Sequence, residues 1–185
     1  MVYVRVVSRN KYKQGDCSMS IEELFQIALI LATFLCSLVA GFLFAFAVVI
    51  MPGIRSLKDS DFIRAFQVMD SVIQNNQPVF LLVWIGSVIA LVTSLVLGIG
   101  QLAGTERLLI IFAAFVYLLG VQLPTIAVNV PLNNTLQALD IDVIDEKTQK
   151  AARSDFEPQW NRWNSIRTVF ASLASVLLQL LLFRL

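Results

Sequence analysis

The sequence predicts an all-α fold: a four-transmembrane-helix up-down bundle with an amphipathic helix in its first long loop. Hydrophobic residues make up 57% of the chain and charged residues only 15%, against about 25% in a typical soluble domain. The hydrophobic residues are also concentrated in four blocks. A chain of this length has too little interior to bury so much apolar surface in water. We therefore expect the lipid bilayer to be its solvent.

The four predicted spans cover residues of about 24–51, 79–99, 108–128 and 166–183. Each is close to the roughly 20 apolar residues that cross a bilayer, and none has a charged residue at its centre. The first span is the longest, so it must tilt or project beyond the hydrocarbon. Residues 100–107 form a short turn, which makes the second and third spans antiparallel neighbours. The two long connections then fall on the same side of the bundle.

The first long connection, residues 52–77, has the pattern of an amphipathic helix. Ser60 suits a helix cap, and apolar residues follow it on one face, namely Phe62, Phe66, Met69 and Ile73. Such a helix would lie on the membrane surface or cover the bundle. Gln67 and Asp70 lie three positions apart on it and so share one side. Two interpretations stay open: Asp70 faces a cavity together with Gln67, or it faces water.

The second long connection, residues 129–165, carries a charged stretch and then a cluster of polar and aromatic residues. Residues 140–155 are expected to form an exposed loop or a short helix. Their acidic residues lack the glycine and the closing glutamate of a calcium loop, so a solvated surface is expected. Pro158 suits the first turn of a helix that continues into the fourth span.

The polar cluster at residues 160–168 reads WNRWNSIRT and leads into the fourth span. On a helix its residues form two adjacent stripes, one of Asn161, Asn164 and Thr168 and the other of Trp160, Trp163 and Arg167. One interpretation is an interfacial belt, with tryptophan at the headgroups and arginine at lipid phosphate. The other is the mouth of a pocket that binds a planar, oxygen-rich and lipophilic small molecule by stacking and hydrogen bonding.

Polar residues also gather at the end of the third span, at Gln122, Thr125, Asn129 and Asn133. Polar side chains at this depth usually face a bundle interior or a cavity. They either join helices through hydrogen bonds or line a ligand site. Pro124 lies among them and is expected to kink the helix. Because this segment and the cluster at 160–168 lie on the long-loop side, we expect them to meet.

The composition excludes several classes of function. Histidine is absent, so zinc, histidine-ligated haem and Ser-His-Asp chemistry lose support, and we expect neither a metal site nor a cofactor. The net charge of +1 gives no electrostatic basis for binding nucleic acid. Cys17 lies in a polar tail and Cys36 in an apolar block, so a disulfide between them is not expected.

Residues 1–18 show no apolar period that fits the bundle, and we expect a disordered or non-native tail before a membrane domain of residues 19–185. Ser20 and Glu23 have the spacing of a capping box, which suggests the hypothesis that translation begins at Met19. The positive charges of the tail decide the positive-inside balance. Orientation therefore stays open, as does the oligomeric state. The expected location is the cell membrane, with multiple passes.

Four segments resemble a widespread family of small four-helix integral membrane proteins that includes the anthrone oxygenases of aromatic polyketide pathways. They are residues 44–53 (FAFAVVIMPG), 66–69 with 76–80 (FQVM and NQPVF), 129–133 (NVPLN) and 160–168 (WNRWNSIRT). The last two are the more specific. Most members of this family have no known function. The anthrone oxygenases oxidise an anthrone carbon to a quinone with O2 and without an evident metal or flavin.

The resemblance implies a cofactor-independent oxygenase with a dry pocket, one base and hydrogen bonds to a developing enolate. The catalytic candidates are Asp70 as the base, at a place where the family commonly has asparagine, and Asn133, Asn164 and Arg167 as donors to the oxygen anion. The ligand-binding candidates are Gln67, Asn129, Trp160 and Trp163. The alternative is a non-enzymatic membrane protein that binds a lipid, a quinone or a partner protein with the same cluster.

Overall fold

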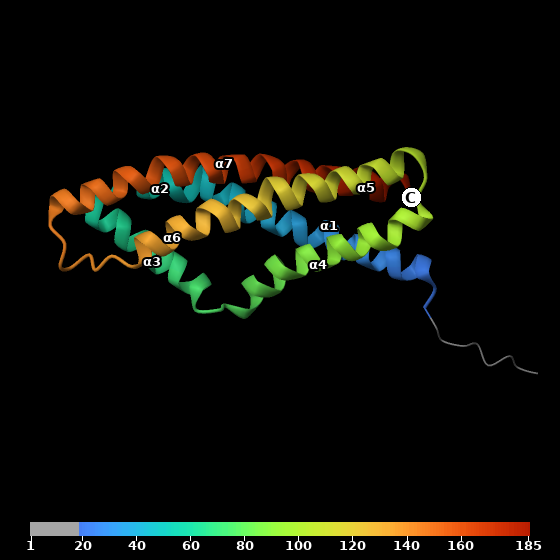
Figure 1. Cartoon of the computed structure of the whole chain (residues 1–185), viewed down its shortest axis with the longest axis horizontal. Coiled ribbons are helices and arrows are strands. Elements are labelled where there is room, and N and C mark those ends of the chain that lie inside the picture. The colour runs from blue at the N-terminus through green and yellow to red at the C-terminus, as the bar shows by residue number, and fades with distance from the viewer. Residues whose placement is uncertain (1–18) are drawn as a thin grey trace, which may run out of the picture.

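The structure is a computed structural model that describes residues 19–185, and the expectations for the tail, for the start of translation and for Cys17 lie outside these residues. Within them the chain is all-helical, as predicted. Four helical stretches are long and apolar enough to cross a membrane, and they cover Ile21–Ile54, Pro78–Gln101, Gly104–Gln137 and Glu146–Arg184. Figure 1 shows them running up and down along one long axis. The protein is therefore a multi-pass membrane protein.

The first span consists of α1 (Ile21–Ala45), a π-helical turn η1 (Phe46–Ile50) and α2 (Met51–Ile54). The capping box at its start is present: the Ser20 side chain accepts a hydrogen bond from the Glu23 backbone N–H, and the Glu23 carboxylate accepts one from the Ser20 N–H. A π turn shifts the backbone hydrogen-bond pattern by one residue and is frequent at functional sites. At the end of α1, the Phe46 N–H is shared between the carbonyls of Phe42 and Leu43.

Helix α3 (Asp59–Gln74) is the predicted amphipathic helix, and it covers the end of the bundle. It begins one residue before the expected cap Ser60, after Lys58. Its apolar face, with Phe62 and Phe66, is buried against α6 (Val130–Gln137) and α7 (Glu146–Arg184). Figure 1 shows α3 at the same end as α6 and the start of α7, which confirms that both long connections lie on one side. The sequence left two placements open for this helix, on the membrane surface or over the bundle, and the structure shows it over the bundle.

Helices α4 (Pro78–Gln101) and α5 (Gly104–Tyr117) are joined by two residues only, as the short-turn prediction required. The third span continues from α5 through the π turns η2 (Leu118–Gln122) and η3 (Thr125–Asn129) into α6. The two π turns flank Pro124, which has no N–H to donate and so disturbs the regular α-helical ladder. The helix is irregular at this proline, while the expected kink stays a prediction.

The fourth span is part of α7, and the prediction that its helix starts near Pro158 was wrong. The helix starts at Glu146, where Asp145 Oδ1 accepts a hydrogen bond from Thr148 N over 2.9 Å, and Pro158 lies in its interior. The charged stretch is helical because it has tertiary partners. Arg153 pairs with Glu157 at 2.8 Å one turn on, and it donates to the backbone carbonyls of Arg55 and Leu57 before α3.

Small residues let the helices approach closely within the membrane core. A Cβ on Gly120 would overlap the Phe170 ring, and one on Gly98 would lie 2.8 Å from the Phe25 ring. Ala171 and Ala174 of α7 are fully buried. Helix α1 packs against α4 and α7, and α5 packs against α7. Toward the α3 end the same helices line a cavity.

Candidate functional site

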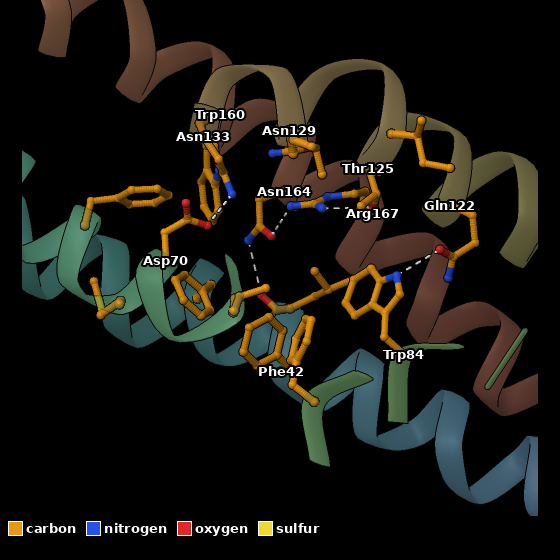
Figure 2. A pocket seen from close by; sticks show the side chains of 18 of the residues that line it. Phe42, Asp70, Trp84, Gln122, Thr125, Asn129, Asn133, Trp160, Asn164 and Arg167 are labelled. Carbon is orange, nitrogen blue, oxygen red and sulfur yellow. Dashed lines mark hydrogen bonds between the residues drawn. The ribbon is translucent and has the colours of Figure 1, made fainter. Parts of the chain in front are cut away.

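A cavity of about 460 Å3 lies beneath α3, enclosed by α1, α4, α7 and the stretch from η2 to α6. It has the size of a typical small-molecule site. One wall is polar and carries Asp70, Gln122, Thr125, Asn129, Asn133, Asn164 and Arg167. The opposite wall is largely aromatic and carries Phe42, Phe46, Phe66, Phe80 and Trp84, while Trp160 lies at the Asp70 end, where it contacts Asn133 of the polar wall. Figure 2 shows the polar residues in a row, from Asp70 at one end to Gln122 at the other.

Asp70 stands at the α3 end of the row. It is only 4% exposed, so the interpretation in which it faces water is excluded. Its two carboxyl oxygens accept hydrogen bonds from Asn133 Nδ2 at 2.8 Å and from Gln74 Nε2 at 2.6 Å. Burial raises the pKa of Asp70 above its ordinary value, because desolvation disfavours the charged form, while the two hydrogen bonds act in the opposite direction.

Asn133 is held between Asp70 and Trp160. Trp160 Nε1 donates to Asn133 Oδ1 at 2.8 Å, while Asn133 Nδ2 donates to Asp70. An indole N–H can only donate, so it fixes which end of the amide faces the carboxylate. The expected meeting of the segment after span three with the segment before span four is therefore confirmed in atomic contacts.

Arg167 lies in the middle of the row and turns inward instead of extending to the headgroups. It is 4% exposed, and its two terminal nitrogens donate to Thr125 Oγ1 and Asn164 Oδ1, each at 3.0 Å. The Thr125 hydroxyl donates to the Val121 carbonyl at 2.7 Å, which leaves its lone pair for the guanidinium. Among residues 19–185, no carboxylate forms an ion pair with Arg167, and its Nε has no partner. A buried cation without a counter-ion thus faces the cavity.

Asn164 joins Arg167 to the first span. Its amide oxygen accepts from Arg167, and its Nδ2 donates to the Leu43 carbonyl over 3.2 Å. Leu43 lies just before η1, where the Phe46 N–H is shared between the carbonyls of Phe42 and Leu43. Irregular backbone at membrane depth is tolerated where another group meets its polar atoms. Asn164 is such a group, and this contact fixes its orientation.

Two amide side chains on the polar wall have buried polar atoms without a hydrogen-bond partner in the described chain. Asn129 is 2% exposed, and neither its Nδ2 nor its Oδ1 has a hydrogen-bond partner within the described chain. Gln122 Oε1 accepts from Trp84 Nε1 at 3.0 Å, but its Nε2 is buried without a partner. A buried polar group without a partner costs about 1–3 kcal/mol. Such groups beside a cavity are suited to a ligand with oxygen atoms along one edge.

The aromatic wall offers flat surfaces. Phe80 and Trp84 are stacked, with ring centroids 5.4 Å apart and planes at 24°. Trp160 contacts Phe46 and Phe66 at centroid distances of 5.7 and 5.4 Å. The Arg167 guanidinium lies 5.9 Å from the centroid of Trp160. Such a wall favours a planar aromatic ligand, which binds rings by stacking and edge contacts.

Most of the residues selected from the sequence line this cavity: Asp70, Asn129, Asn133, Trp160, Asn164 and Arg167. Gln67 and Trp163 do not line it. The Gln67 amide donates to the carbonyls of Leu136 and Leu139, each at 2.9 Å, and so holds α3 against the end of α6. Trp163 is half-buried on the neighbouring face of α7.

Three lining residues were not among the catalytic and ligand-binding candidates: Gln122 and Thr125, for which helix joining and a ligand site both stayed open, and Trp84. Gln122 and Thr125 were visible as polar residues inside an apolar span, which is a signal for a cavity. Trp84 gave no such signal, because a tryptophan in an apolar block is ordinary. Its hydrogen bond to Gln122 crosses between two spans and is visible only in three dimensions.

The fold and the site together define a class: a four-helix multi-pass membrane protein with an internal cavity that has one polar and one aromatic wall. Comparison with protein families matches residues 71–177 to the family described as anthrone oxygenase. The match covers more than half of the chain, so the chain belongs to the anthrone oxygenase family, as its motifs predicted. Asp70 lies immediately before the matched segment. The comparisons with curated proteins and with solved structures gave no match.

Proposed function

We propose that this protein is a cofactor-independent oxygenase that oxidises a lipophilic aromatic carbon acid such as an anthrone. One observation carries the proposal. A buried carboxylate and a buried guanidinium, which has no ion-pair partner among residues 19–185, face the same cavity from one wall, opposite a wall of aromatic rings. The family match supports the same chemistry. The non-enzymatic alternative uses the same cavity to bind a quinone or another flat lipophilic molecule.

The first step is removal of a proton from the activated CH2 group of the substrate. Asp70 in its ionised form is the base, and its raised pKa makes it a stronger one. The electron pair of the broken C–H bond moves into the ring system and places negative charge on the substrate carbonyl oxygen. Arg167 and Asn129 supply donors for that oxygen, and the buried setting strengthens their interaction with it.

The second step consumes O2, which is the oxidant. The carbanion carbon forms a bond to one oxygen atom, and the other oxygen takes the proton held by Asp70, which yields a hydroperoxide. Loss of the remaining hydrogen on that carbon, with cleavage of the O–O bond, gives the carbonyl of the quinone and one molecule of water. Four electrons leave the carbon in all, two when the hydroperoxide forms and two when it loses water, and O2 accepts all four. Asp70 returns to its ionised form when it gives its proton to the peroxide oxygen.

The remaining candidates act by position. Asn133 has both ends of its amide engaged, by Asp70 and Trp160, so its role is to aim the carboxylate. Asn164 holds Arg167 against the cavity. Trp160 presents an aromatic face at the Asp70 end. Gln67 contributes indirectly, because its two hydrogen bonds place α3 over the cavity, and Trp163 has no role in this scheme.

The test is anthrone oxidation by the purified protein in lipid nanodiscs, followed by O2 uptake and by quinone absorbance. We expect a rate above that of empty nanodiscs, and its loss in Asp70→Asn. The matched control is Asp61→Asn, because Asp61 is an exposed aspartate on the same helix. Anthrone that binds without faster oxidation supports the non-enzymatic alternative. Absence of both binding and oxidation contradicts the proposal.

A further inference from the structure

The cavity is exposed along one side only. Of the side chains that line it, those of Ile85, Ile126 and Val130 are exposed, at 52%, 71% and 43%, whereas the other lining residues are buried or half-buried. Ile85 belongs to α4, Ile126 to η3 and Val130 to α6. A residue that both lines a cavity and is exposed marks where the cavity opens. The opening therefore lies between α4 and the η3–α6 stretch.

This opening lies within the membrane-spanning part of the protein. Ile85 is seven residues into α4, which begins at Pro78, and so stands roughly 10 Å along the helix at 1.5 Å per residue. That depth is well inside a hydrocarbon core of about 30 Å. All three exposed lining residues are aliphatic, as is usual for a surface that faces lipid. In Figure 1, α4 and the α5–α6 helix start together at their short connection and separate toward the α3 end.

The side toward water is held closed by hydrogen bonds. Gln74 Nε2 lies 2.6 Å from Asp70 Oδ2 and 3.3 Å from Asn134 Oδ1, so this amide connects α3 to α6. Gln67 adds two bonds from α3 to the end of α6. Arg153 of α7 donates to the backbone just before α3 and pairs with Asp59 at 3.1 Å. Helix α3 is thus fixed on both of its sides. In the described chain the hydrogen bonds from α4 to the third span reach only Tyr117 of α5 and Gln122 of η2, and η3 and α6 beyond them have no side-chain hydrogen bond to α4.

We propose that the ligand enters and leaves this cavity laterally, from the lipid hydrocarbon, through the opening between Ile85 of α4 and Ile126 of η3. This proposal rests on the proposed function, because it takes the ligand to be a lipophilic aromatic molecule that dissolves in the membrane. A flat molecule that slides in edge-first meets Trp84 and Gln122 at the side and Arg167 at the back. The protein then draws its substrate from the membrane pool and not from water.

The first experiment needs no ligand. In a background of Cys17→Ser and Cys36→Ala, the variant Val88→Cys places a thiol inside the cavity. Labelling is compared for benzyl methanethiosulfonate, which dissolves in membranes, and for the charged trimethylammonium-ethyl methanethiosulfonate, which stays in water. We expect fast labelling by the first reagent alone. Adding Ile126→Trp should slow it by at least about tenfold, the lower end of the range over which association rates vary among related variants.

The matched control is Leu123→Trp, because Leu123 is 55% exposed on the same helix, one turn away, and does not line the cavity. On α4 the corresponding pair is Ile85→Trp and Ile89→Trp, and Ile89 is 60% exposed and does not line the cavity. All four side chains are largely exposed, so none of these tryptophans displaces a core residue. At Leu123 and Ile89 the added ring meets lipid only, whereas at Ile126 and Ile85 it also lies at the opening. Thermal unfolding of each variant checks that the fold is retained.

The second experiment measures anthrone binding in nanodiscs without O2, by quenching of tryptophan fluorescence after rapid mixing. Narrowing the opening with Ile126→Trp should slow association and dissociation alike and leave Kd nearly unchanged. If the wild-type protein does not bind anthrone, the proposed function fails, while the labelling experiment still tests the opening. Fast labelling by the charged reagent, or equal labelling rates for Ile126→Trp and Leu123→Trp, would overturn the lateral path.

Discussion

Replacing Arg167 with methionine separates a ligand-binding role from a structural one. The guanidinium gives two charged hydrogen bonds, to Thr125 and Asn164, and each such bond contributes about 1.5–3 kcal/mol to stability. Against this, burying a cation without a counter-ion costs several kcal/mol, which the methionine removes. The two effects oppose each other. We expect the free energy of unfolding of Arg167→Met to lie within about 2 kcal/mol of the wild-type value.

Binding should respond far more strongly. Truncating one partner of a buried, hydrogen-bonded charge pair costs about 2–5 kcal/mol of affinity, which corresponds to a rise in Kd of roughly 30-fold to several-thousand-fold. The assay is equilibrium binding of a hydroxyanthraquinone, which is stable in air and ionises at its phenol, to the protein in nanodiscs. Arg162→Met is the control, because Arg162 is exposed on the same helix and does not line the cavity.

Two results would refute the reasoning on Arg167. An unchanged Kd in Arg167→Met would mean that the cation does not meet the ligand. A loss of more than about 4 kcal/mol of stability would mean that Arg167 holds the helices together and carries no uncompensated charge, since breaking a compensated buried pair costs about 3–5 kcal/mol. Arg167→Lys adds a further check, because a lysine keeps the charge and lacks the planar fork that reaches both Thr125 and Asn164.

Three more predictions follow from particular residues. Oxidation by the wild type should rise with pH through the pKa of Asp70, which burial raises, because the ionised carboxylate is the base; Asp70→Asn should remove this rise in an assay of initial rates across pH. A carboxyl group whose pKa is raised by folding stabilises the protein below its unfolded-state pKa, and this contribution is lost as pH rises through the folded-state pKa. We therefore expect Asp70→Asn to be at least as stable as the wild type at neutral pH. Thermal unfolding should show this advantage of the variant shrinking as the pH is lowered. Gly120→Ala should destabilise the bundle by about 1–3 kcal/mol, because its Cβ would meet the Phe170 ring. Gly41→Ala is the control, because Gly41 has open space around it and should show no such loss of stability. Equal stabilities of the two variants would contradict the close approach of η2 and α7.

Hydropathy and helical periodicity were enough to predict the spans and the amphipathic helix. Four apolar blocks gave the spans, and the spacing of Phe62 and Phe66 gave the amphipathic helix before span two. The start of α7 was not predictable in this way, because residues 146–155 are charged and their helix is stabilised by contacts with the segment before α3. Arg153 makes those contacts across almost a hundred positions of sequence, at distances that no local pattern encodes.

The site was predictable in its residue types and not in the direction of each side chain. Trp160 and Trp163 lie on the same predicted stripe, three positions apart, yet only Trp160 reaches the cavity and meets Asn133. Three residues advance a helix by less than one full turn, so Trp160 and Trp163 point in different directions. The difference is enough for one to face the cavity while the other faces the neighbouring side of α7. The burial of Asp70 depends on how α3 lies on α6, and the sequence left that choice open.

The most direct test of the central claim is a crystal structure of the protein grown from lipid with anthraquinone, the stable oxidation product, bound. We expect the ring system of the ligand between the aromatic wall and α7, with one of its oxygens within hydrogen-bond distance of Arg167 or Asn129. Anthraquinone found on the lipid-facing surface of the helices, with the cavity filled by water or by side chains, would contradict it.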